Sequence, residues 1–171
     1  MIKITFFLMA LLASAGCATQ QTTLRTTYDP QETARLLEPG NNTIKGSALM
    51  RQLNGGTITC AGREVHLSPV TSYSAERMLV IYKSAHRGYK RILVRSDRSP
   101  FTNENDEYLR SARVKTCDAQ GFFKFENVAD GKFFINTAVQ WQINPYFLEG
   151  GVLMQQVAVT GGEIKEIVLA P

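Results

Sequence analysis

The sequence predicts an all-β fold, a Greek-key β-sandwich of about seven strands with a short N-terminal helix and an inserted helix and loop segment. Three observations lead to this prediction. Short runs alternate apolar and polar residues, as strands with one buried face do, and residues 121–126 are the clearest case. Glycine, asparagine or aspartate stands between the runs, where tight turns need these residues. The apolar fraction of 44% is normal for a chain with a buried core.

Residues 1–16 have the pattern of an export signal. Lys3 supplies one positive charge, and residues 4–15 are uncharged and mostly apolar. This run is shorter than the roughly 20 residues of a membrane-spanning helix, so it fits a cleaved signal peptide. The ending Ser14-Ala15-Gly16-Cys17 resembles a bacterial lipobox, which implies cleavage before Cys17 and attachment of lipid to its sulfur. An ordinary secretory signal is the alternative.

A lipidated Cys17 would hold the protein on the membrane, because each buried methylene adds about 0.8 kcal/mol to membrane binding. In a Gram-negative host, Ala18 resembles the residue that sorts lipoproteins to the outer membrane, facing the periplasm. Residues 17–41 are then expected to form a tether with a short helix. Asp29 is its predicted N-cap, with Glu32 placed for a capping box, and Pro39-Gly40 ends the helix.

Two cysteines remain beside Cys17, and they predict one disulfide. An even number of cysteines in an oxidising compartment indicates pairing, so Cys60 and Cys117 are expected to be joined. The bond would close a long loop, which the chain-entropy model values at up to about 4 kcal/mol. Neither cysteine has a second cysteine or a histidine at zinc-ligand spacing, so no metal site and no cofactor is predicted.

The main domain is expected to span residues 42–171. In order, its predicted strands are residues 43–50, 57–60, 63–70, 121–126, 133–142, 152–159 and 164–169. Turn signals such as Asn54-Gly55-Gly56 and Asp130-Gly131 separate them. Residues 57–60 are compatible with a strand or a loop, and residues 143–151 are expected to form a loop. Alternation places Phe123, Phe125 and Phe133 in the core.

Residues 72–109, the inserted segment, are expected to lie over one edge or end of the sandwich. Residues 74–83 fit a helix capped by Ser74 or an apolar strand, and the helix is favoured because good helix formers dominate. A basic stretch follows, and it could meet lipopolysaccharide, anionic lipid or an acidic partner; a solvated surface is the alternative. Its candidate residues are Arg87, Lys90, Arg91 and Arg95. The net charge of +4 is mild and does not indicate a nucleic-acid partner.

The pattern Asp118-x-x-Gly121-x-Phe123-x-Phe125-x-x-Val128-x-x-Gly131-x-Phe133 resembles the core signature of carboxypeptidase regulatory-like domains. The resemblance implies a transthyretin-type β-sandwich and no peptidase activity, because in metallocarboxypeptidases this module stands beside the catalytic domain. His66 and His86 lie in no catalytic motif, and the sequence has no nucleophile elbow or phosphate loop. A non-enzymatic protein is therefore predicted.

The function predicted first is that of a structural or protein-binding module displayed from the membrane. The alternative is a module that binds carbohydrate or peptidoglycan. It would use Trp141, Tyr146 and Phe147, which lie close together in the sequence and would form a recognition surface if exposed. A Trp141 that only plugs one end of the sandwich is the competing interpretation.

Overall fold

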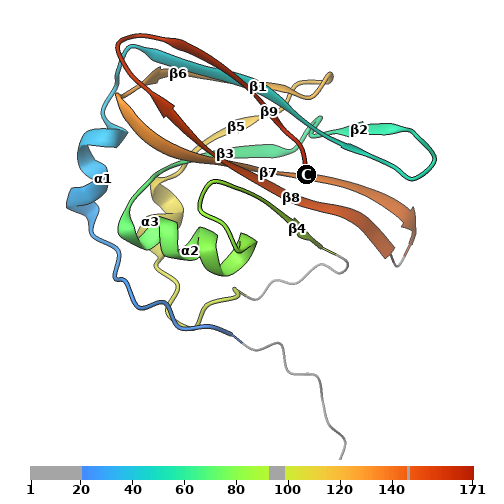
Figure 1. Cartoon of the computed structure of the whole chain (residues 1–171), viewed down its shortest axis with the longest axis horizontal. Helices are drawn as coiled ribbons and strands as arrows, with labels where there is room; N and C mark the ends of the chain where they lie inside the picture. Colours follow the sequence, from blue (N-terminus) through green and yellow to red (C-terminus); the bar gives the residue numbers. More distant parts are fainter. Residues whose placement is uncertain (1–20, 93–98, 146) are drawn as a thin grey trace, which may run out of the picture.

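The structure, a computed structural model, describes residues 21–92, 99–145 and 147–171. Over these residues two sheets pack face to face, with nine strands in place of the predicted seven or so, and the all-β sandwich is confirmed (Figure 1). The four-stranded sheet contains β1 (Asn42–Arg51), β2 (Thr57–Thr59), β6 (Phe122–Val128) and β9 (Ile164–Leu169). The five-stranded sheet has the order β4 (Arg87–Arg91), β8 (Phe147–Val159), β7 (Gly131–Asn144), β3 (Glu64–Pro69) and β5 (Arg113–Thr116).

The core between the sheets includes the three phenylalanines that alternation predicted. Phe123 and Phe125 from β6 are buried, as are Phe133 and Ile135 from β7. Strand β1 lies centrally in its sheet because it pairs with β6 on one side and runs parallel to β9 on the other. The first and last strands of the sandwich, β1 and β9, are therefore neighbours in one sheet.

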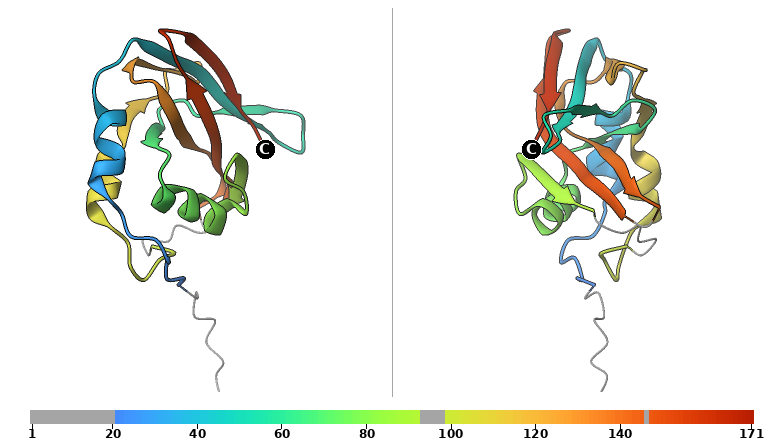
Figure 2. Two further views of the ribbon diagram at one scale, coloured as in Figure 1. Left: turned by 60° about the vertical axis from the view of Figure 1, so that its left-hand side comes forward. Right: turned by 90° about the vertical axis from the view of Figure 1, so that its right-hand side faces the viewer.

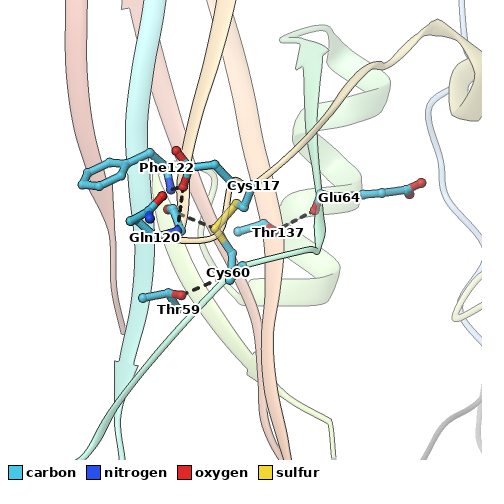
Figure 3. The surroundings of a disulfide bond; sticks show 10 residues. Thr59, Cys60, Glu64, Cys117, Gln120, Phe122 and Thr137 are labelled. Atoms are coloured by element: carbon cyan, nitrogen blue, oxygen red, sulfur yellow. Dashed lines mark hydrogen bonds between the residues drawn. A yellow bond between two sulfur atoms is a disulfide. The ribbon is translucent and has the colours of Figure 1, made fainter.

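One buried disulfide joins Cys60, just after β2, to Cys117, just after β5, as predicted (Figure 3). Their Cα atoms are 5.8 Å apart. The turn that follows Cys117 requires glycine at Gly121, where φ is +88° and a Cβ atom would stand 2.4 Å from the Thr59 side chain. The disulfide and this turn together fix the start of β6 against the end of β2.

The prediction of a loop at residues 143–151 is wrong. Strands β7 and β8 stay paired as far as Asn144 and Phe147, so the segment is the tip of one long hairpin. Glycine is needed inside the sheet at the end of this segment, because a Cβ atom on Gly151 would stand 2.2 Å from the Lys90 carbonyl oxygen. Strand β4 was also missed, because its mostly basic residues show no apolar alternation.

The inserted segment covers one face of the five-stranded sheet with a helix and also supplies β4, an edge strand of that sheet, so the predicted position over an edge holds for β4 only (Figures 1 and 2). Its main element is α2 (Ser72–Tyr82), so the helix prediction for residues 74–83 is confirmed. Met78 packs on Phe134 and Met154, which point away from the sandwich core and need a cover. The N-cap is Thr71, three residues before the predicted Ser74, which instead completes a capping box with it.

The chain before the sandwich is packed against the inserted segment from residue 21 onward and is not a free tether there. The backbone of Leu24 exchanges two hydrogen bonds with the Asn103 side chain, and Leu24 is buried. Helix α1 (Pro30–Leu37) has Asp29 as its N-cap, as predicted, and the Asp29 side chain accepts a hydrogen bond from the backbone N–H of Gln31. Glu32 does not complete a capping box but accepts hydrogen bonds from Ser72. None of the helices in the described ranges is long and apolar enough to cross a membrane.

Candidate functional site

The hairpin of β7 and β8 carries the aromatic residues that the sequence singled out. Trp141 pairs with Glu149 across the hairpin, and Phe147 pairs with Asn144 next to the turn. Trp141 is half-buried and packs against the sandwich core, whereas Phe147 is 59% exposed. Tyr146 lies outside the described residues. An exposed ring therefore stands near the tip of the hairpin, and a partly covered ring stands nearer the core.

Strand β4 adds a third ring and an ion pair on the same face of the sheet. Tyr89 also packs against the core, and its hydroxyl donates a hydrogen bond of 3.2 Å to the carbonyl oxygen of Gly150. Arg91 follows two residues later, on the same face of the strand, with its guanidinium 3.4 Å from the Glu149 carboxylate. We call Tyr89, Arg91, Trp141, Phe147 and Glu149 the hairpin surface.

The predicted basic patch is partly occupied by contacts within the protein. Arg87 donates hydrogen bonds to the carbonyl oxygen of Ala170, close to the C-terminus, and Arg91 belongs to the ion pair just described. Lys90 is exposed, and Arg95 lies outside the described residues. Two of the four cations thus connect β4 to its neighbours, and the idea of an anionic partner stays a prediction.

The two histidines lie on different elements, His66 on β3 and His86 in the loop before β4. His86 is exposed, with its Nδ1 atom 3.3 Å from the Gln156 side-chain oxygen. His66 is half-exposed on β3, with its Nε2 atom 3.4 Å from the Glu64 carboxylate. Within the described ranges no three histidine, cysteine, aspartate or glutamate side chains gather as a metal site would require. The prediction that the protein is not an enzyme remains a prediction.

A cavity that the sequence did not indicate lies between α2, α3 (Asp106–Ser111) and the outer face of the five-stranded sheet. Its volume is about 220 Å³. The lining residues are His66, Ser68, Arg77, Met78, Ile81, Tyr82, Tyr108, Leu109, Ala112 and Asn136. An open groove of about 400 Å³ lies beside it and shares His66 and Asn136, which pair across β3 and β7. We call the smaller, half-open space the outer-face cavity.

Arg77 is the charged group of this cavity, and only 7% of it is exposed. Its guanidinium carbon lies 4.5 Å from the ring centre of Phe101 and 4.8 Å from that of Tyr108, within cation–π range. Its Nη1 atom forms an ion pair with Glu104. Its Nε atom is buried and has no hydrogen-bond partner among the described residues. A buried donor of this kind is rare in folded proteins and calls for an explanation.

Two tyrosines of the cavity are held in the protonated form. Burial raises the pKa of Tyr108, and the positive charge of Arg77 opposes this effect only in part. Burial likewise raises the pKa of Tyr82. The Tyr108 hydroxyl lies within hydrogen-bonding reach of Ser68 on β3. The cavity is therefore lined by two neutral tyrosines and by Arg77, whose positive charge is balanced by Glu104.

The fold and its sites define a class of protein, an all-β sandwich with a helical insertion on one sheet face. The chain is similar to a solved structure from Pseudomonas aeruginosa, described as that of a proposed carbohydrate-binding protein. The two are 22% identical with a TM-score of 0.69, and the similarity covers 85% of this chain and 99% of that one. No family model and no curated protein matches the chain. The similarity supports the fold, and the resemblance to carboxypeptidase regulatory-like domains stays a prediction.

Proposed function

We propose that this protein is an exported, non-enzymatic module that binds envelope glycans through the hairpin surface and is anchored to the membrane through Cys17. The observation that carries the proposal is an exposed Phe147 ring beside the half-buried Trp141 and the ion pair of Arg91 and Glu149. An aromatic ring can cover the apolar face of a sugar. Charged side chains next to it can bind the sugar hydroxyl groups, as in other aromatic-lined sites with a few polar groups.

The comparison with the solved structure adds support at the level of the fold. That protein is described as a proposed carbohydrate-binding protein, and its sandwich matches most of this chain. A structural or protein-binding role, the function predicted first from the sequence, would use the same exposed ring. The two roles differ in the partner, so binding to purified glycan separates them.

Replacing Phe147 by alanine is expected to weaken binding to peptidoglycan fragments about tenfold, because an exposed aromatic anchor contributes heavily to a recognition site. The fold should be retained, since 59% of this side chain is already in solvent. Isothermal titration calorimetry of the full chain in detergent measures the affinity.

The matched control is Phe122→Ala, which removes another exposed phenylalanine, 54% in solvent, from the four-stranded sheet. This variant should bind as the unmodified protein does. Equal affinity of the Phe147→Ala variant and the unmodified protein would contradict the glycan proposal. Binding of a protein partner without any binding of glycan would favour the structural or protein-binding role.

A Cys17→Ser substitution is expected to leave the precursor uncleaved and without lipid, because the lipobox resemblance makes this sulfur the attachment point. Mass spectrometry of the protein from bacterial membranes measures both changes. The control is Ser14→Leu, which brings the motif closer to the commonest lipobox and should be processed normally. Normal cleavage and lipidation of the Cys17→Ser protein would remove the anchoring claim.

A further inference from the structure

Residues 21–28, which we call the N-terminal strap, are bound along the inserted segment. The backbone of Thr22 donates a hydrogen bond of 2.8 Å to the Pro100 carbonyl oxygen and accepts one of 3.1 Å from the amide of Thr102. The Gln21 side chain donates to two further carbonyl oxygens of the same loop. The contacts that hold the strap therefore begin at its first residue.

A carboxylate of α2 binds the middle of the strap. Glu76 accepts hydrogen bonds of 2.9 Å and 2.8 Å from the backbone N–H groups of Arg25 and Thr26, and one of 2.6 Å from the Thr26 hydroxyl. Two side chains of the strap, Leu24 and Tyr28, are buried in an aromatic cluster of the inserted segment. Because its amides are bonded and its apolar side chains are buried, the strap is part of the folded domain.

The strap begins at the end of the molecule opposite to the four-stranded sheet. In all views of Figures 1 and 2 its blue start lies at the bottom, whereas β1, β6 and β9 lie at the top. Gln21, Thr23 and Thr102 are exposed at this end, and all three are polar and uncharged. Such side chains suit contact with hydrated lipid headgroups, because their entry into hydrocarbon would leave them without hydrogen-bond partners.

We propose that the N-terminal strap holds the sandwich close to the bilayer, with residues 99–103 next to the lipid headgroups and the four-stranded sheet facing away from them. The inference rests on the proposed lipid anchor at Cys17, which lies outside the described residues. Gln21 is the fourth residue after Cys17, so their Cα atoms can be at most about 14 Å apart. A free chain over residues 17–41 could instead extend to about 90 Å. Docking of the strap therefore keeps this end of the domain near the membrane.

Hydrogen exchange of the full chain in detergent tests the strap without depending on the lipid. The amides of Arg25 and Thr26 should exchange at least about a hundredfold more slowly than those of an unstructured peptide, and Glu76→Ala should remove most of this protection. The matched control is Glu107→Ala, which removes an exposed carboxylate of α3 and should leave the protection unchanged. Exchange at peptide rates in the unmodified protein would overturn the proposal.

The orientation is tested by energy transfer on phosphatidylcholine vesicles that contain a headgroup-labelled acceptor lipid. The lipidated protein carries a fluorescent donor on the cysteine of a Thr102→Cys variant, beside the strap, or of a Lys124→Cys variant, on the exposed face of the four-stranded sheet. Transfer should be about twofold more efficient from position 102, because Gln21 can lie no more than about 14 Å from Cys17. Equal or greater transfer from position 124 would overturn the orientation.

A longer connection separates a docked strap from a free tether. Insertion of a Gly-Ser linker of about eight residues between Ala18 and Thr19 roughly triples the reach from Cys17 to the strap, so transfer from position 102 should fall toward that from position 124. The same linker in the turn between β1 and β2 should leave the transfer unchanged. An unchanged value after the first insertion would overturn the proposal.

Mass spectrometry of the same samples separates this inference from the anchoring claim. Lipidated protein with equal transfer from both positions would overturn the orientation and leave the anchor at Cys17 intact. Protein without lipid would overturn the anchor, and the orientation with it.

Discussion

Removal of the bond between Cys60 and Cys117 is expected to lower the free energy of unfolding by about 4 kcal/mol. The bond spans 57 residues, so the reduced unfolded chain gains much conformational freedom. A loss of this size is a large part of the 5–15 kcal/mol that typical domains have. The Cys60→Ala/Cys117→Ala variant, unfolded with urea and followed by Trp141 fluorescence, gives the measurement.

Both cysteines are buried, so the double variant also loses some packing. Reduction of the unmodified protein provides the control, because it breaks the bond and keeps both sulfur atoms. The Cys17→Ser variant should unfold like the unmodified protein, since it leaves the disulfide in place. A loss below about 1 kcal/mol on reduction would show that the bond adds little stability beyond that given by the two sheets and the turn at Gly121.

The sandwich could be predicted because apolar and polar residues alternate along strands such as β6, which has one buried face and one face in solvent. Phe123 and Phe125 alternate with solvated residues, and both are buried in the core together with Phe133. The disulfide could be predicted from the number of cysteines once the lipobox resemblance had set Cys17 aside. Such features depend on local patterns or on simple counting, and the surrounding structure does not have to be known.

The hairpin tip and the outer-face cavity were not predicted, for a different reason in each case. Residues 143–151 contain Pro145 and a glycine pair, which usually mark loops, yet here the glycines make room for the neighbouring strand. The cavity brings together side chains from α2, α3, β3 and β7, which are far apart in the sequence. Arg77 looks like an ordinary surface residue of a helix, and only the packing of Phe101 and Tyr108 around it reveals its burial.

Replacing Glu104 by alanine is expected to destabilise the inserted segment by about 3–5 kcal/mol, because Arg77 would remain buried with no counter-charge. The loss should exceed that of an ordinary contact, since the Nε atom already lacks a partner. Hydrogen exchange of the amides in α2 measures the local stability, and urea unfolding measures the stability of the whole domain.

The Arg77→Met/Glu104→Ala variant separates the ion pair from the packing. Methionine keeps an apolar, flexible side chain between the rings of Tyr73, Phe101 and Tyr108, so most of the stability should return. The matched control is Glu166→Ala, which breaks the exposed pair with Lys45 and should cost at most about 1 kcal/mol. If Glu104→Ala were as mild as Glu166→Ala, solvent would be reaching the Arg77 guanidinium, and the buried ion pair would not be what stabilises the segment. A double variant less stable than Glu104→Ala would instead show that the cation–π contacts, and not the charge balance, hold the segment on the sheet.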